Sequence, residues 1–574
     1  MKIRKLTIEN FRGIKNADII FDGHTVLIGD NNAGKSTILE AIDLVLGPDR
    51  LGRLPVIDEH DFFNGIYIDK NEEPVVVKIE LIVGDLSKEQ IRKFSNNLEF
   101  WNTDNKRLIE EPPVEQINSK NVEEVIRVGF NGEYDKGDDD FVGETFFCSP
   151  VDIKSKFGKA DKRDCGFLYL RALRTGSRAL SLERGSLLDI ILRIQELRPQ
   201  MWENILKQLR ETEVKSGADD EVNKILSNVQ DSLKEFVPTD WGSKPHLKVS
   251  NLTRDHLRKT LVVFMSTGFD GHFVPFFHQG TGTINTMVLA LLSMIAELKQ
   301  SVIFAMEEPE IAIPPYTQKR IINSIRNKSS QAIFTSHSPF VLEEFEPKHI
   351  TLINREDGEM TGTPIEFPST IKPKAYSKEF RMRFAEALLA KRILITEGST
   401  EASSYSAAAR RLSELDPFTY QSFEAMGVAI FNAESENSIP IFGEFFASLG
   451  KETFAVYDKQ SKTANRYKIE ESVDYSFESK HKGFECLIIK ETERDVLLNY
   501  VQDLYNNGDW PTHINVKENV SDMDDDDFDE ALLNYLTWQK AAGSSSEIIS
   551  ICDLDQMPAT LKEQIAEITD LIES

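Results

Sequence analysis

The sequence predicts an α/β fold in two parts, and three observations lead to this prediction. A glycine-rich phosphate loop, residues 29–37, stands between an apolar strand and a helix-forming run. Two more apolar runs, residues 302–306 and 331–335, each end in a cluster of polar side chains. After residue 391 strands and helices alternate again, with acids following the strands. Such alternation is typical of parallel sheets covered by helices.

Length and composition indicate a soluble chain of two or three domains. The 574 residues are 40% hydrophobic and 28% charged, which is ordinary for globular proteins. No stretch approaches 18 apolar residues and the start lacks a signal-peptide pattern, so we expect a cytoplasmic protein without a membrane span. The four cysteines show no CxxC spacing, which indicates neither disulfides nor zinc: Cys148, Cys165, Cys486 and Cys552.

The net charge of −27 argues against non-specific coating of nucleic acid, which requires a basic surface, but it is compatible with a local basic groove. Part of the acidic excess lies in two aspartate runs, Asp138–Asp140 and Asp524–Asp527. We interpret both runs as solvated loops. Adjacent side chains in an extended loop point apart, so neither run is expected to form a metal site.

The phosphate loop is the first motif along the chain. A strand over residues 2–10 is closed by Asn10-Phe11-Arg12-Gly13, and a second strand over 25–28 leads into the loop, which a helix over 37–46 follows. Backbone N–H groups and the helix N-terminus favour phosphate there. Lys35 is expected to reach the terminal phosphates and Ser36 to hold magnesium. The residues predicted to contact ATP are Gly29, Asn31, Asn32, Ala33, Gly34, Lys35, Ser36 and Thr37.

The two apolar runs that follow supply the acids that such a loop requires. The run over 302–306 ends at Glu307-Glu308-Pro309-Glu310. We expect Glu307 to hold a magnesium-bound water and Glu308 to polarise the attacking water. The run over 331–335 leads to His337, which we expect to sense the terminal phosphate; the alternative is a structural histidine.

A second glycine loop precedes the helical run over residues 284–298. Its glycines, Gly280 and Gly282, are predicted to contact ATP bound to an opposing subunit. A plain helix start explains this loop equally well. Residues 180–245 carry helical patterns without sustained heptads, which favours a short helical insert that pairs two subunits over a long coiled-coil arm.

The second half begins after a connector predicted over residues 356–378 and a helix over 379–390. A strand over 391–396 ends at Glu397-Gly398, and Glu401 follows. Further on come a strand over 427–431, a helix over 439–449 and a strand over 453–457 that ends at Asp458. Acids at the carboxyl edge of a parallel sheet can hold a divalent metal against a phosphodiester.

The motifs at residues 29–37, 307–310 and 335–339, with the Asn10-Phe11-Arg12 opening, resemble the ATPase heads of the ABC class in the SMC, Rad50 and RecF branch. The order of glutamate-glycine and then a strand ending in aspartate resembles the Toprim domain. An ABC head followed by Toprim is the architecture of the OLD (overcoming lysogenization defect) family nucleases, and this resemblance covers essentially the whole chain. It divides the chain into an ABC ATPase N-terminal lobe (1–178), a helical dimerisation insert (179–250), a C-terminal ATPase lobe (251–378) and a Toprim nuclease domain (379–574).

The resemblance assigns further roles in the second half. Glu397 and Glu401 would bind metal, with Glu397 acting as general base. Asp458 would bridge to the metal, and Glu485 resembles the later acid of the OLD-type site. Lys540 resembles a C-terminal lysine that would steady the transition-state phosphate; a surface lysine is the alternative.

The chain departs from the family pattern at three positions. Toprim sites carry Asp-x-Asp, whereas the second position here is Gln460, so either Glu485 or Glu434 completes the site or only one metal is held well. Glu307 stands where aspartate is commoner. Pro314 stands where relatives often have histidine, which would alter the subunit contact.

The resulting hypothesis is an ATP-binding and ATP-hydrolysing DNA endonuclease or nickase of the OLD type that uses Mg²⁺ or Mn²⁺. The resemblance implies a homodimer or higher homo-oligomer in anti-phage defence, with a partner such as a helicase-like protein or a retron reverse transcriptase with its RNA–DNA hybrid. One alternative is a regulatory or scaffold ATPase whose Toprim domain binds nucleic acid or a partner but cleaves poorly. Another, a RecF-type repair ATPase, leaves residues 391–574 unexplained.

Overall fold

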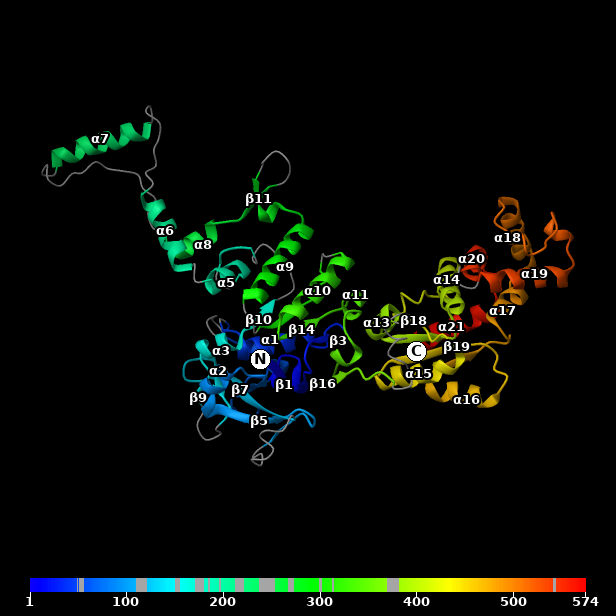
Figure 1. Ribbon diagram of the computed structural model, residues 1–574, viewed down its shortest axis with the longest axis horizontal. Coiled ribbons are helices and arrows are strands. Elements are labelled where there is room, and N and C mark those ends of the chain that lie inside the picture. The colour runs from blue at the N-terminus through cyan, green and yellow to red at the C-terminus, as the bar shows by residue number, and fades with distance from the viewer. Residues whose placement is uncertain are drawn as a thin grey trace. The chain divides into compact units, whose positions relative to one another are not determined.

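The computed structural model (Figure 1) describes residues 1–48, 50, 56–109, 121–149, 155–170, 180–183, 186–195, 198–211, 221–236, 253–266, 273–298, 302–311, 314–368, 381–539 and 543–573. The chain divides into two compact units. The first comprises residues 1–27, 34–336 and 353–362, and the second comprises 28–33, 337–352 and 363–574. Each unit has its own sheet and core.

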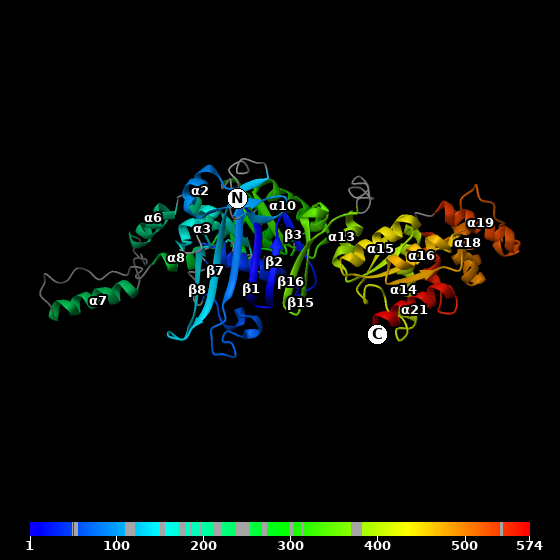
Figure 2. The same ribbon diagram turned by 90° about the horizontal axis from the view of Figure 1, so that it is seen from below.

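A 14-stranded mixed sheet forms the frame of the first half of the chain. Twelve strands follow the order β10-β13-β14-β3-β15-β16-β2-β1-β4-β7-β5-β6, and β8 and β9 extend it from β7. Figure 2 shows β1, β2, β16 and β15 lying side by side. The strands are β1 Lys2–Phe11, β2 Ile14–Ile20, β3 Thr25–Ile28, β4 Val77–Gly84, β5 Leu98–Asn102, β6 Arg107–Ile109, β7 Val122–Asp135, β8 Asp140–Phe147, β9 Ser155–Lys156, β10 Phe167–Leu170, β13 Ile303–Glu307, β14 Gln331–Thr335, β15 Ile350–Glu356 and β16 Glu359–Pro364.

Helix α1 (Lys35–Leu46) lies between two parts of this sheet. It contacts β1, β4 and β7 on one side and β10 and β13 on the other. Accordingly it is apolar nearly all round, and its side chains from Ile38 to Leu46 are mostly buried. A helix buried on both sides is held by the core and not by surface contacts. The phosphate loop at its N-terminus therefore rests on a rigid element.

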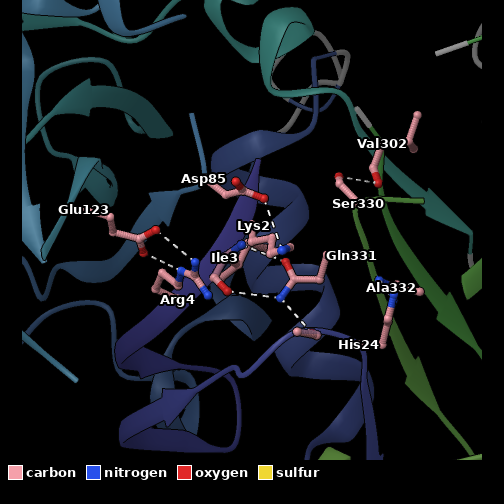
Figure 3. A network of polar contacts seen from close by, with 11 residues as sticks. Lys2, Ile3, Arg4, His24, Asp85, Glu123, Val302, Ser330, Gln331 and Ala332 are labelled. Carbon is pink, nitrogen blue, oxygen red and sulfur yellow. Dashed lines mark hydrogen bonds and ion pairs between the residues drawn. The ribbon is translucent and has the colours of Figure 1, made fainter. Parts of the chain in front are cut away.

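Gln331 joins the start of β14 to the start of β1, as Figure 3 shows. Its fully buried amide accepts from the Ile3 N–H at 2.7 Å and donates to the Ile3 carbonyl at 3.0 Å. A third bond goes to the Gly23 carbonyl at 3.0 Å. A buried amide is tolerated only when its polar atoms are satisfied, and here they link strands that are not sheet neighbours. This contact fixes the amino ends of the strands, opposite the edge that carries the motifs.

The remaining helices of this half are α2 Lys88–Lys93, α3 Lys159–Cys165, α5 Leu187–Ile194, α6 Arg198–Glu211, α7 Glu221–Phe236, α8 Arg254–Thr260, α9 Thr281–Leu298, α10 Pro315–Lys328 and α11 Pro339–Leu342, with a hairpin of β11 Phe264–Ser266 and β12 Phe273–Pro275. The helical content predicted for residues 180–245 is confirmed in α5, α6 and α7. In α7 the apolar side chains Ile225 and Val229 are exposed by 59% and 44%. The pairing role of this insert stays a prediction.

The second unit is built on a four-stranded parallel sheet in the order β18-β17-β19-β20. Its strands are β17 Arg392–Thr396, β18 Val428–Asn432, β19 Glu452–Tyr457 and β20 Tyr475–Glu478. Its helices are α13 Arg381–Leu389, α14 Ser399–Leu415, α15 Ile439–Ser448, α16 Thr463–Ser472, α17 Phe484–Glu491, α18 Arg494–Asn507, α19 Asp525–Trp538, α20 Ser544–Ile551 and α21 Ala559–Glu573. The strand–helix alternation predicted after residue 391 is confirmed.

Both faces of this sheet are covered by apolar side chains, as parallel strands require. On one face a phenylalanine cluster from α13, β18 and α15 packs ring against ring: Phe384, Phe431, Phe442, Phe445 and Phe446. On the other face α14 packs against α20 and α21. Each fully buried side chain of this size contributes about 1.5–3 kcal/mol.

Two sequence-based expectations are corrected by the fold. The segment predicted as a connector contains β16, which pairs in parallel with β2, so the large sheet continues to Pro364. The run Asp524–Asp527 is a helix start and not a loop. Asp524 caps α19 by accepting from the Asp526 N–H, and acids in a first turn are favoured by the helix dipole. No helix of the described ranges is long and apolar enough to cross a bilayer.

Glu491 holds the C-terminal helix α21 to the sheet domain. Its charge makes the stability of this domain depend on pH. Its carboxylate accepts from the Thr560 N–H and hydroxyl, both at 2.7 Å, and contacts the His481 ring at 2.8 Å. Burial opposes the charged form, but these hydrogen bonds outweigh it and lower the pKa of Glu491. The contribution is therefore present above the ordinary carboxyl pKa of about 4.3 and is lost as pH falls through the depressed value.

We expect Glu491→Gln to lower the thermal midpoint of the second unit by about 2–4 °C at pH 7, which corresponds to about 1 kcal/mol. The difference should be smaller at pH 3 than at pH 7, because the wild-type carboxyl becomes protonated as the pH falls towards its depressed pKa. Thermal unfolding followed by fluorescence at both pH values measures it. A gap of equal size at both values would contradict the assigned role.

Candidate functional site

The phosphate loop links β3 to α1, and the helix begins at Lys35, two residues earlier than predicted. Neither a side-chain cap nor an acid occupies the first turn of α1. Its N–H groups and dipole are therefore available to an anion. Lys35 is 8% exposed, whereas Ser36 is exposed. Within the loop, Asn31 and Asn32 are exposed and Ala33 is buried.

Gly34 is required by its conformation and by its surroundings. It caps α1 with φ of 97°, in the left-handed region that favours glycine. A Cβ at this position would also lie 2.4 Å from the methyl group of Met360 on β16. The strand that was predicted to be a connector therefore packs directly against the loop.

Arg12, directly after β1, anchors the phosphate helix α1. Its guanidinium pairs with Glu40 of α1 at 2.7 Å and with Asp61 at 2.8 Å. Burial disfavours the charge, but the two carboxylates outweigh burial and raise the pKa of Arg12. Arg12 also has φ of 53°, an unusual conformation for a non-glycine residue. The Asn10-Phe11-Arg12 opening thus positions α1 in this structure.

The strand order brings the predicted acids to the edge that carries the loop. Strands β13, β14 and β3 are adjacent and parallel, and Glu307 pairs in register with Thr335, which pairs with Leu27. Carboxyl ends of adjacent parallel strands share one edge. Glu307 and His337 therefore follow strands whose ends neighbour the start of the phosphate loop. This relation was expected from the motifs.

Glu308 has a strained backbone. Its φ is 42°, and its N–H donates to the Thr335 carbonyl at 2.9 Å, which holds the turn against β14. A non-glycine residue in this region costs about 1–3 kcal/mol and persists where its surroundings enforce it. Next to it, Glu310 accepts from the buried Ser336 hydroxyl at 3.0 Å. The ends of β13 and β14 are thus tied together by one backbone bond and one side-chain bond.

The second glycine loop is the N-terminus of α9. Gly280 and Gly282 are exposed, and a Cβ at either position would meet no described atom within 4 Å. The chain's own described packing does not require glycine here. Contact with ATP of another subunit stays a prediction. Pro314 is the exposed residue that precedes α10.

In the second unit Glu397 and Asp458 follow two strands that form a topological switch point. From β17 the chain goes first to β18 on one side and then to β19 on the other. The connections that follow β17 and β19 therefore run to opposite sides, and the crevice where they begin is where open α/β sheets bind ligands. Glu397 follows β17 and Asp458 follows β19. The Asp458 N–H donates to Oε2 of Glu397 at 3.5 Å, so the two loops are in contact.

Glu401 lies in the first turn of α14 and is 5% exposed. Its carboxylate packs against Gly398, where a Cβ would lie 2.7 Å from Oε2. One turn later, Tyr405 is fully buried and donates to Gln564. Burial, followed by the charges of Glu401, Asp458 and Glu491, raises the pKa of Tyr405. The phenol therefore stays neutral beside a cluster of carboxylates.

Glu485 lies in the first turn of α17 and is 7% exposed. Its loop is tied to the Asp458 loop, because the Lys459 N–H donates to the His481 carbonyl at 3.0 Å. The rings of Phe484 and Tyr405 lie 6.1 Å apart, which links α17 to α14. Lys540 lies outside the described residues.

Gln460 does not present its amide as a ligand in this structure. Its Nε2 donates back to the Asp458 carbonyl at 3.0 Å, and its N–H donates to Glu478 at 2.8 Å. Glu478, at the end of β20, also pairs with Arg466 at 3.4 Å. Glu434, the other acid considered for this role, is 40% exposed and lies 3.9 Å from Arg383. Glu485 is therefore the better-placed of the two alternatives.

The donor set fits magnesium or manganese. Within the described ranges no three His, Cys, Asp or Glu side chains form a ready-made metal cluster. Mg²⁺ does not require one, because it binds through one or two carboxylates, keeps several waters and takes other ligands from phosphates. Glu397 and Asp458 supply two carboxylates on touching loops, and oxygen donors select such ions over softer metals.

Sequence reasoning missed two contributors. Tyr169 on β10 donates its hydroxyl to Oε1 of Glu307, and Glu478 fixes the Asp458 loop through Gln460. The apolar run Phe167–Leu170 indicates the strand that carries Tyr169, but the sequence does not indicate that this strand pairs with β13. Glu478 could similarly have been found as the acid that ends the strand β20.

Two family models match the chain. One, described as AAA ATPase domain, matches residues 1–162 and 170–342. The other, described as Overcoming lysogenization defect protein-like, TOPRIM domain, matches residues 388–459. The OLD nuclease of Thermus scotoductus is 23% identical over 441 residues, which cover 69% of this chain and 71% of that protein. The Old nuclease of Escherichia phage P2 is 23% identical over 449 residues, which cover 73% and 71%.

Solved structures give a weaker likeness. An SMC head bound to the C-winged helix domain of ScpA is 16% identical, covers 63% of this chain and 98% of its own, and has a TM-score of 0.35. The SMC head domain from Thermotoga maritima covers 64% and 100%, with 14% identity and a TM-score of 0.29. These scores are too low to carry an argument about this chain.

Proposed function

Because this chain belongs to the AAA ATPase domain family and continues into an OLD-like Toprim domain, we propose that it is an ATP-hydrolysing, metal-dependent DNA endonuclease or nickase. The observation that carries this proposal is the contact between the Glu397 and Asp458 loops at the switch point of the second sheet. Carboxylates on neighbouring strand ends are what phosphodiester hydrolysis with a divalent cation requires.

In the ATPase half, the N–H groups of the phosphate loop cradle the phosphates, and Lys35 neutralises the terminal ones. Ser36 and Glu307 would hold Mg²⁺ directly and through water. Glu308, held in its turn by the Thr335 carbonyl, orients the attacking water. His337 contacts the terminal phosphate from the end of β14.

In the Toprim half, Glu397 and Asp458 would hold one Mg²⁺ or Mn²⁺, with Glu401 and Glu485 completing the acidic site. A divalent cation supplies Lewis-acid charge at the phosphodiester and lowers the pKa of a coordinated water. Glu397 takes the proton of the attacking water. Glu478 keeps the Asp458 loop in place by accepting from the backbone N–H of Gln460.

Assembly and biological role form the finer part of this proposal. The exposed Gly280 and Gly282 at the start of α9 and the exposed apolar side chains of α7 suit contacts between copies in a homodimer or higher homo-oligomer. We place the protein in anti-phage defence with a partner such as a helicase-like protein or a retron reverse transcriptase with its RNA–DNA hybrid. This part rests on the architecture shared with the OLD relatives.

A cleavage assay tests the activity. Plasmid and single-stranded DNA are incubated with Mg²⁺ or Mn²⁺ and wild type, Glu401→Ala or Glu414→Ala, the last being an exposed control on the same helix. We expect nicking or cutting by wild type and the control, and a loss of at least about 100-fold in Glu401→Ala. EDTA should stop the reaction. Intact substrates with every metal, even with a neighbouring-gene partner present, would exclude nuclease activity.

The alternative is a regulatory or scaffold ATPase that binds nucleic acid or a partner but cleaves poorly. The neutral Gln460 and the net charge of −27 favour it. Under this alternative DNA or a partner is retained in a binding assay, and no DNA is cleaved.

A further inference from the structure

We propose that Tyr169 is a positioning residue of the ATP site, where its hydroxyl holds the Glu307 carboxylate in place for magnesium. The inference rests on the proposed ATPase function and deepens it. Tyr169 lies far from every sequence motif of that function. It belongs to β10, the strand at the end of the large sheet, and β10 pairs in parallel with β13.

The register explains how the contact forms. Tyr169 is opposite Ala305, and Glu307 is two residues beyond Ala305 on the same strand. Side chains two residues apart point to the same face of a sheet. Glu307 is therefore the diagonal neighbour of Tyr169 on the same face of the parallel pair. The Tyr169 hydroxyl donates to Oε1 of Glu307 across this diagonal.

The long side chain of Glu307 explains why a hydrogen bond from Tyr169 would be useful. Aspartate is commoner at the end of such a strand, and glutamate adds one rotatable bond between the backbone and the carboxylate. Each additional freely rotating bond must be ordered when the carboxylate binds its target. A hydrogen bond to an ionised carboxylate is about twice as strong as a neutral one, so Tyr169 fixes the longer side chain before magnesium arrives.

The pairing also links the ATP site to the edge of the sheet. Tyr169 and Glu307 are both half-buried, so the bond is partly shielded from water. Phenylalanine at position 169 would keep the ring and its packing and lose only the donor. The proposal therefore makes a specific claim about the hydroxyl.

Four proteins test it: wild type, Tyr169→Phe, Glu307→Asp and the double variant. The first readout is magnesium-dependent binding of a fluorescent ATP analogue, and the second is phosphate release. We expect Tyr169→Phe to raise the magnesium concentration for half-maximal analogue binding about tenfold, the size of one hydrogen bond to a charged group. In the Glu307→Asp background the same change should have no effect, because the shorter carboxylate falls short of the hydroxyl.

Tyr134→Phe is the matched control. Tyr134 also donates to a carboxylate, that of Asp139, at the β7–β8 turn away from the ATP motifs. This variant should leave the magnesium response unchanged. An unchanged response in Tyr169→Phe, or an equal effect of that change in both backgrounds, overturns the proposal. If Glu307→Asp itself loses the magnesium response, the comparison of Tyr169→Phe with Tyr134→Phe decides. If wild type binds the analogue without releasing phosphate, ATP hydrolysis fails while the positioning role is still measured.

Discussion

Replacing Lys35 by alanine is expected to reduce ATP hydrolysis by about 100-fold to 1,000-fold, the range found when one preorganised charge-stabilising group is removed. Lys35 is nearly buried at the start of α1, and the first turn of this helix contains no acid. The loss should appear in nucleotide binding as well, because the proposed contact of Lys35 with the phosphates already exists in the ground state. Phosphate release and binding of a fluorescent ATP analogue measure the two effects.

Glu308→Gln separates chemistry from binding. The amide keeps the size of the side chain but cannot take a proton, so hydrolysis should fall by a similar factor while analogue binding remains. Lys348→Ala, at an exposed lysine that pairs with Glu346, is the control and should match wild type. Unchanged phosphate release in both Lys35→Ala and Glu308→Gln would refute the assignment of this ATP site.

Removing the carboxylate of Asp458 should lower the rate of DNA cleavage by at least about 100-fold. Mutating even the residues that support metal ligands lowers activity or metal affinity 10–100-fold. Asp458→Asn and Glu397→Gln are expected to behave alike, since their loops meet at one switch point. ATP hydrolysis without DNA should persist in both. Plasmid nicking and phosphate release on the same preparations measure this separation.

Gln460→Ala is the structural control for this pair. The side-chain amide of Gln460 donates a hydrogen bond to the Asp458 carbonyl. Losing this bond should cost about 1 kcal/mol of stability. Cleavage should stay within about threefold of wild type. A cleavage loss as large as that of Asp458→Asn would show that Gln460 acts at the metal, contrary to its orientation here.

The ATPase motifs and the second sheet could be predicted because their signals are local. The phosphate loop is one continuous segment between a strand and a helix, and Glu307 and Asp458 each end an apolar run. Strand-ending acids were therefore visible without any knowledge of the fold. Segment β16 was missed because its polar, glycine-containing sequence lacks strand alternation and is held by β2, far away in the chain.

The prediction of a loop at Asp524–Asp527 was wrong for a related reason. Four successive aspartates have poor helix propensity, which favours a loop. In the structure the first caps α19, the second pairs with Arg494 at 2.9 Å, and the helix dipole favours the others. Tertiary contacts and capping override propensity at this helix start.

By itself the sequence determined that the chain joins a phosphate loop to a sheet edge with acids, because each motif occupies consecutive residues. Only the tertiary structure decided which acids meet and which groups hold them. Glu397 meets Asp458 because the strand order places β17 beside β19, and Glu307 meets Tyr169 because β10 ends the large sheet next to β13. Strand order and register depend on packing across the whole domain, and no local pattern encodes them.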